Sequence, residues 1–303
     1  MERVKPVRPI VPQIKTKYGI MHTVGPAIEL TTMIGCPLMC TFCPQDNLRD
    51  AYGKEAIKYM RLEDLDYILD KIPINARIDF SGMSEPWANP ACTDMLEITL
   101  QKGFTVAIFS TLYGMKETEV DRVVSMLEKY DKQVEIVCLH LPDSNGNMKG
   151  WKYSEEWETV FNKMARARVT CGVGAMTMDG SGRVHDAISH FARVSFGFDG
   201  HSRADSLNLD QIKGQTIKIA TRHTAPLTCR STPFYDRGVL LPNGDVVLCC
   251  MDYNLKHIIG NLLESDYNDL FKSPVLLDLI KINETPGFSK CSICKSCDNV
   301  RGI

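Results

Sequence analysis

Apolar residues follow two different periods along this chain. Mostly apolar runs of strand length occur at 27–34, 77–81, 105–110, 134–140 and 169–175, with a sixth at 193–198. Apolar residues spaced for one face of a helix lie between or after them, at 62–71, 93–102, 117–129, 155–166 and 184–191. This alternation predicts a parallel sheet covered by helices. Five or six such units predict a partial α/β barrel, since a complete eightfold barrel takes about 250 residues.

The pattern changes beyond about residue 205. Residues 238–248 predict a β-hairpin around a Pro-Asn-Gly-Asp turn, and 267–282 predict a helix before a cysteine-rich tail. We therefore expect an extended arm at 1–25, a barrel at 26–205 and a small domain at 206–303.

Candidate chemistry begins directly after the first predicted strand. Cys36, Cys40 and Cys43 are separated by three and two residues. Three thiolates on one short loop can hold three irons of a cubane cluster and leave the fourth iron open for reaction. A structural zinc site is the alternative, but such sites need four ligands and no fourth Cys or His lies nearby in the sequence. The spacing favours an open iron–sulfur cluster.

This spacing, with the aromatic Phe42 before the third cysteine, resembles the radical S-adenosylmethionine (radical SAM) superfamily. The resemblance implies a partial (β/α)6 barrel and a 4Fe–4S cluster whose open iron binds the amino and carboxylate groups of S-adenosyl-L-methionine (SAM). It also implies that an electron from the cluster cleaves SAM. The resulting 5′-deoxyadenosyl radical then abstracts a hydrogen atom from the substrate.

Active-site residues of such sheets gather at the carboxyl ends of the strands. Polar and small residues lie near the ends of the later predicted strands, and they extend the resemblance. Residues 82–85 look like the family's Gly-Gly-Glu-Pro segment, which binds the cofactor amino group, with one glycine replaced. An ordinary strand-to-helix turn is the alternative reading. The expected cofactor-binding residues are Phe42, Gly82, Met83, Ser84, Glu85, Ser110, Thr111, His140 and Gly174.

Six further cysteines lie in the last third of the chain, whereas a cluster held entirely by protein needs four. Their spacing resembles the start of the SPASM/twitch auxiliary-cluster domain. The resemblance implies a twitch-like β-hairpin/helix domain with one additional 4Fe–4S cluster; zinc is the alternative. The candidate ligands are Cys229, Cys250, Cys291, Cys294 and Cys297.

Cys249 and Cys250 are adjacent, and adjacent residues on a strand point to opposite faces. One of them is therefore expected to be a spare thiol near the active site, and it can donate a hydrogen atom to a carbon radical. The resemblance to aminoglycoside epimerases assigns this role to Cys249, with the reverse order of the pair left open. An inert packed thiol is the alternative.

Hydrogen donation on the face opposite to abstraction inverts a carbon, so we expect an epimerase. The resemblance implies a small carbohydrate-like substrate of aminoglycoside type, as in antibiotic biosynthesis. Alternatives are a dehydrogenase of an aminocyclitol or sugar alcohol, a peptide-modifying radical SAM enzyme, and a non-catalytic iron–sulfur or zinc scaffold.

Composition and charge restrict the kinds of partner that this protein can be expected to bind. The 303 residues carry a net charge of −2, so no global basic field favours a nucleic-acid partner. Apolar runs stay below the roughly 18 residues of a membrane span, and the basic N-terminal segment lacks the apolar core of a signal peptide. The twelve cysteines then favour metal binding or catalysis over disulfides. We expect a cytoplasmic enzyme with an external electron donor such as flavodoxin or ferredoxin.

Overall fold

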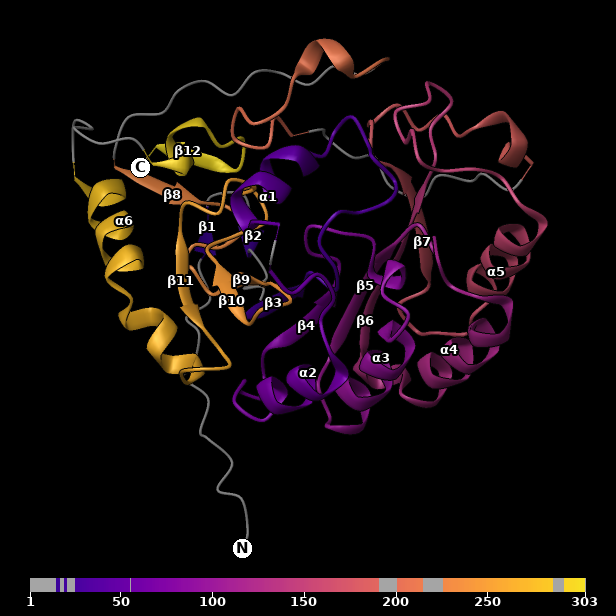
Figure 1. Cartoon of the computed structure of the whole chain (residues 1–303), viewed down its shortest axis with the longest axis horizontal. Coiled ribbons are helices and arrows are strands. Elements are labelled where there is room, and N and C mark those ends of the chain that lie inside the picture. The colour runs from indigo at the N-terminus through magenta and orange to yellow at the C-terminus, as the bar shows by residue number, and fades with distance from the viewer. Residues whose placement is uncertain are drawn as a thin grey trace, which may run out of the picture.

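An eight-stranded sheet is the centre of the molecule in the computed structural model (Figure 1). The structure describes residues 25–54, 56–190, 201–214, 226–285 and 292–302, and the backbone of 15–16 and 19–20. The strand order is β11-β10-β9-β3-β4-β5-β6-β7. The bounds are β3 (Ala27–Leu30), β4 (Arg77–Phe80), β5 (Val106–Ser110), β6 (Val134–Leu141), β7 (Val173–Thr177), β9 (Arg237–Leu240), β10 (Asp245–Val247) and β11 (Ile258–Asn261).

Six neighbouring strands of this sheet, from β9 through β3 to β7, run parallel to one another. Two short antiparallel pairs lie outside it: β1 (Lys15–Thr16) with β2 (Gly19–Ile20), and β8 (Leu227–Cys229) with β12 (Val300–Gly302). The expected parallel α/β sheet, with helices between successive strands, is confirmed.

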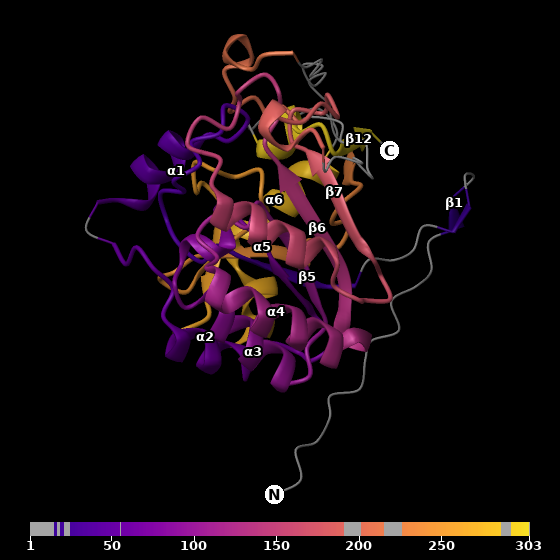
Figure 2. The same ribbon diagram turned by 90° about the vertical axis from the view of Figure 1, so that its right-hand side faces the viewer.

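Helices α2 (Leu62–Leu69), α3 (Cys92–Gln101), α4 (Glu117–Lys129) and α5 (Glu155–Ala165) connect the parallel strands and cover one face of the sheet (Figure 2). α1 (Gln45–Tyr52) follows the cysteine loop, and α6 (Pro274–Glu284) lies beside β11. No helix of the described ranges is both long and apolar enough to cross a membrane.

Two predicted helices differ from the structure. Residues 184–190 hold only the short 3-10 turn Asp186–Ile188, because Ile188 is the one fully buried apolar side chain and no apolar stripe forms. The helix expected at 267–282 is divided into a 3-10 segment, Tyr267–Lys272, and α6. Pro274 begins the second piece, because proline lacks the N–H that would continue the first. The strand expected at 193–198 lies outside the described residues.

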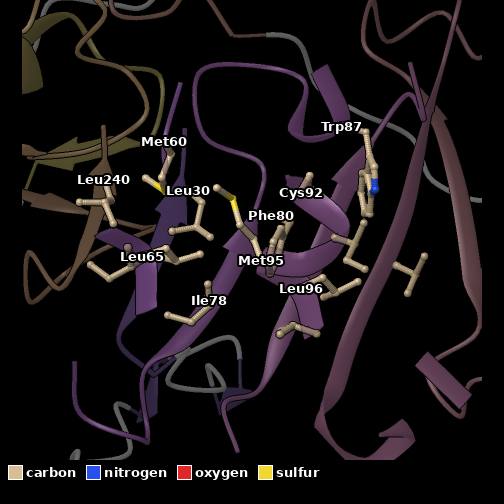
Figure 3. Packing of buried hydrophobic residues seen from close by; sticks show 14 of the residues in the cluster. Leu30, Met60, Leu65, Ile78, Phe80, Trp87, Cys92, Met95, Leu96 and Leu240 are labelled. Atoms are coloured by element: carbon tan, nitrogen blue, oxygen red, sulfur yellow. The ribbon is translucent and has the colours of Figure 1, made fainter. Parts of the chain in front are cut away.

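Packing follows the two-residue period of the strands. Ile28 and Leu30 of β3, with Ile78 and Phe80 of β4, are at most 1% exposed and belong to the cluster that α2 and α3 cover (Figure 3). The residues between them, Glu29 and Asp79, are paired in register and therefore point to the other face. The barrel thus has an apolar outer layer and charged side chains inside.

The hairpin expected at 238–248 is present and joins the main sheet. Its first strand, β9, pairs in parallel with β3, so that Ala27 lies opposite Arg237 and Leu30 opposite Leu240. Gly244 closes the turn at φ +87°, where another side chain would collide with Asn261 and Leu263. The C-terminal part of the chain therefore completes the sheet that carries the cysteine loop.

The α3 contact gives a direct stability test. Leu96→Ala removes a fully buried side chain between α3 and the sheet, so we expect a loss of about 2 to 5 kcal/mol in the free energy of unfolding. Leu277→Ala is the control, because Leu277 is 52% exposed and its loss should change stability by about 0.5 kcal/mol or less. Chemical denaturation would measure both; equal effects would contradict the packing described here.

Candidate active site

A pocket of about 590 Å³, part of it open to solvent, lies at the carboxyl ends of the parallel strands. Its walls come from the cysteine loop after β3, the loop after β4, the ends of β5 and β6, and single residues from farther along the chain. All three loop cysteines, Cys36, Cys40 and Cys43, line it. Burial raises the pKa of Cys36 to about 12 and that of Cys40 well above its usual value, so these thiols are neutral without a bound metal.

The side chain of Gln45, which is 7% exposed, holds one side of the cysteine loop. Its Oε1 accepts a hydrogen bond from the Cys36 N–H at 3.2 Å. Its Nε2 donates to the Met83 carbonyl at 2.6 Å and to Cys43 Sγ at 3.2 Å. One amide thus ties the first and third cysteines to the loop after β4.

Asn147 holds the other side of the loop. Thr41 donates from its N–H to the Asn147 carbonyl at 2.9 Å and from its hydroxyl to Asn147 Oδ1 at 2.8 Å. The Asn147 amide also bonds to Asp143 and to the backbone of Lys213. Nearby, the Gly150 N–H donates to the Leu38 carbonyl at 2.7 Å. A Cβ on Gly150 would lie 2.0 Å from the Pro37 carbonyl oxygen, so only glycine fits there.

Glu85, at the end of the loop after β4, is 4% exposed and lines the pocket. Its carboxylate accepts hydrogen bonds from the Thr111 N–H and hydroxyl, both at 2.8 Å, from the Ser110 hydroxyl and from the Trp87 N–H. Burial raises the pKa of Glu85 above its usual value. Four donors satisfy the lone pairs of this carboxylate, which fixes the β4 loop against the end of β5.

Three residues from different parts of the chain complete the pocket wall. His140 of β6 has its pKa lowered to about 4, first by burial and then by the charge of Arg203, so its imidazole is neutral at pH 7. Tyr253 is 2% exposed, and its hydroxyl lies 3.2 Å from Cys43 Sγ. The Arg203 guanidinium lies 5.8 Å from the centre of the Tyr253 ring.

Most of the residues expected to bind a cofactor line this one pocket: Phe42, Gly82, Met83, Ser84, Glu85, Thr111 and His140. Ser110 and Gly174 do not. Ser110 is fully buried one layer behind and donates to Glu85. Gly174 lies near the start of β7, paired with Cys138, because β7 begins later than the sequence pattern indicated.

The structure adds residues that sequence reasoning missed. Gln45 and Tyr253 line the pocket, and Asn147 supports it from behind. Only Gln45 had a usable signal, its position two residues after Cys43. The others come from distant segments and could not be placed by spacing.

The second cysteine group separates into two environments. Burial raises the pKa of Cys249, and the charges of Cys250, Cys294 and Cys297 add to this effect. Burial likewise raises the pKa of Cys294 and of Cys297, and the charge of Cys229 contributes to both. Cys229, Cys249, Cys294 and Cys297 are therefore neighbours, while Cys291 lies outside the described residues.

Cys250 belongs to the other environment. After burial, the largest influences on its pKa are Glu29 of β3 and Arg203, and it packs in the same apolar cluster as Cys43 and Tyr253. Its side chain thus faces the barrel and the pocket residues. Both thiols lie beyond the end of β10, in the turn after the strand, so the strand alternation expected for the pair does not apply to them.

Comparison with known proteins agrees with this architecture. Residues 229–298 match the SPASM family, described as an iron–sulfur cluster-binding domain. The structure of BtrN in complex with AdoMet and 2-DOIA superposes with a TM-score of 0.59 at 14% identity, covering 92% of this chain and 95% of that one. Native anSMEcpe with bound AdoMet gives a TM-score of 0.50 at 14% identity, covering 90% of this chain and 86% of that one. No match was found among curated proteins.

The chain shares the fold of these two structures. A SPASM segment follows at its C-terminus. Within this fold, the described residues include no three histidine, cysteine or carboxylate side chains that converge on a single ion. A cubane cluster does not require that, because each thiolate binds a different iron. The donor sets fit: three thiols line the pocket, and four neighbouring thiols lie in the SPASM segment.

The close contact at Gly150 predicts the behaviour of one variant. Gly150→Ala should displace the cysteine loop and lower the iron bound per chain after anaerobic reconstitution, by up to about four atoms. Gly25→Ala is the matched control, since a Cβ there meets only the Asn75 carbonyl oxygen at 3.9 Å. Iron and sulfide analysis measures the result, and full iron content in Gly150→Ala would contradict the loop packing.

Proposed function

We propose that this protein is a radical SAM enzyme that binds SAM in the pocket at the carboxyl ends of the sheet. The observation that supports it most is the meeting of Cys36, Cys40 and Cys43 with the Glu85 loop and His140 on one pocket wall. An open-cluster donor set and polar strand ends are what this chemistry requires. The SPASM match adds an independent iron–sulfur segment.

In this proposal Cys36, Cys40 and Cys43 hold a 4Fe–4S cluster as thiolates. Burial raises the pKa of Cys36 and of Cys40, so these two thiols are neutral without metal and cluster loading releases their protons, which higher pH favours. When bound and reduced by an external donor such as flavodoxin or ferredoxin, the cluster supplies the electron that cleaves SAM to methionine and the 5′-deoxyadenosyl radical. Gln45 and Tyr253 place hydrogen-bonding groups beside Cys43, where such groups tune a cluster's potential.

The loop after β4 would receive the SAM ammonium group. Glu85 already accepts four hydrogen bonds, so its part is to fix the loop while main-chain carbonyls supply the open acceptors. Gly82 permits this loop: at φ +58° a Cβ would lie 2.6 Å from the Leu30 carbonyl oxygen and from Thr31 Oγ1. Thr31 Oγ1 in turn accepts from the Met83 N–H at 3.0 Å.

For the outcome we propose epimerisation of a carbohydrate-like metabolite, with Cys250 as the hydrogen-atom donor. The support is the position of Cys250 beside Glu29, Arg203 and the apolar cluster that includes Cys43 and Tyr253. The substrate hydrogen goes to the adenosyl radical, and the hydrogen of the Cys250 S–H bond goes to the opposite face of the carbon. One electron and one proton then restore the thiol.

This proposal exchanges the two roles expected from the sequence. Cys249 becomes the fourth cluster ligand with Cys229, Cys294 and Cys297, and Cys250 becomes the free thiol. A dehydrogenase is the second candidate, because Cys297 also influences the pKa of Cys250 and so the SPASM thiols lie near the pocket side. A cluster there could accept an electron from a substrate radical.

The enzyme class is tested by reductive cleavage of SAM. Anaerobically reconstituted protein with dithionite should release 5′-deoxyadenosine and methionine, and Cys43→Ala should abolish the release because the cluster loses a ligand. Cys171→Ala is the matched control, since Cys171 is an exposed thiol outside the pocket. Chromatography of both products gives the result. No cleavage by the wild-type protein would reject all three enzymatic readings.

The reaction outcome is tested with the cysteine pair in D₂O. With an accepted carbohydrate substrate, the wild-type protein should give an inverted product carrying one solvent deuterium. Cys250→Ala should lose that product and keep its iron, whereas Cys249→Ala should lose about four irons per chain. Mass spectrometry and iron analysis measure these outcomes.

Two results would overturn the assignment. Loss of iron in Cys250→Ala with full iron in Cys249→Ala would restore the order expected from the sequence. A product oxidised by two electrons and free of deuterium would establish the dehydrogenase instead.

A further inference from the structure

Arg203 is a cation of the pocket wall that forms no ion pair within the described part of the chain. It lines the pocket, and its contact there is the face of Tyr253, 5.8 Å from its guanidinium carbon. Among the described residues no hydrogen bond or ion pair of its guanidinium is present. Five N–H donors of a planar group therefore stay available to a ligand.

The backbone holds Arg203 in this position at a conformational cost. Arg203, Ala204 and Asp205 have φ values of +51°, +52° and +63°, a left-handed conformation that side chains other than glycine rarely adopt. Such strain persists only where surrounding contacts impose it, and it is frequent at ligand sites.

Those contacts come from the SPASM segment. Ser202, which is 1% exposed, donates from its N–H at 2.7 Å and from its hydroxyl at 2.8 Å to Asp298 Oδ2. The N–H of Asp205 donates back to the Ser202 hydroxyl at 3.3 Å. The C-terminal tail thus fixes the turn that directs Arg203 into the pocket.

Among the described residues no carboxylate pairs with Arg203, and Cys43, whose charge also reaches it, would be a cluster ligand. His140 is neutral, and Glu85 accepts bonds from other donors. Glu29 is the carboxyl whose charge reaches Arg203, but burial raises the pKa of Glu29 to about 7, so near neutral pH it is only partly ionised. A ligand oxyanion would complete this arrangement.

We propose that Arg203 anchors a carboxylate or phosphate group of the substrate, so that the pocket takes an acidic carbohydrate-like molecule. Guanidinium pairs with such oxyanions through two parallel hydrogen bonds, which fixes orientation as well as affinity. The inference rests on the proposed function and narrows its substrate class. A polycationic aminoglycoside would bring ammonium groups against Arg203 and is disfavoured.

Binding of an oxyanion probe tests this directly. Inorganic phosphate is titrated calorimetrically into reconstituted protein saturated with SAM. Arg203→Gln should weaken phosphate binding about tenfold or more, and Arg203→Lys should weaken it less, because the charge is kept and the fork is lost. Arg168→Gln, at an exposed arginine in the α5–β7 connection, should leave it unchanged. Equal binding by wild type and both Arg203 variants, each verified as folded by circular dichroism, would overturn the proposal.

A second arm distinguishes the substrate from the cofactor, whose methionyl carboxylate has the same chemistry. SAM and decarboxylated SAM are titrated into wild type and Arg203→Gln. Unchanged affinities for both support a substrate anchor. A loss confined to SAM assigns Arg203 to the cofactor carboxylate and overturns the proposal. SAM cleavage without substrate is measured on the same preparations. If Arg203→Gln still cleaves SAM, the proposed radical SAM function stands, and a negative phosphate result then counts only against the role of Arg203.

Discussion

The hydrogen bonds of the Gln45 side chain set the geometry on which the candidate site depends. The three-cysteine loop has a single backbone bridge, between Cys40 and Met148, so its other polar groups need side-chain partners. Gln45 supplies them on one side, between Cys36, Cys43 and the end of β4, and Asn147 does so on the other. The loop is therefore fixed by neutral amides that add no charge beside the thiols.

Charged side chains inside the barrel are also arranged with few unpaired charges. Asp79 is bound by Arg77 through two hydrogen bonds, at 2.6 and 2.9 Å, so that pair is internally neutral. Glu29 lies opposite Asp79 on the neighbouring strand and has a raised pKa. Arg203, which lines the pocket, has no such ion pair among the described residues, as expected if the pocket receives a charged ligand.

Sequence reasoning succeeded where the information is local. The spacing of Cys36, Cys40 and Cys43 identifies them as a set, and strand ends that meet at one edge of a sheet bring in Glu85, Thr111 and His140. It failed for Ser110, which was expected in the pocket. Ser110 directly precedes Thr111 at the end of the strand, so its side chain points to the layer behind the pocket and donates to Glu85. Tyr253 could not be found, because only the tertiary fold brings it to Cys43. The surroundings of Cys249 and Cys250 likewise depend on the turn that follows β10.

The pairing of β9 with β3 also determines when this protein can fold. Ala27 and Arg237 are register partners separated by 210 positions of sequence. The Ser202 N–H likewise donates to Asp298, which is 96 positions farther along the chain. Contacts of such separation slow folding, and a strand edge that waits for its partner is prone to aggregation. During synthesis β3 leaves the ribosome long before β9 exists, so its outer edge stays unpaired for most of translation. The sheet that carries the cysteine loop is therefore complete only after β9 has been synthesised and has paired with β3.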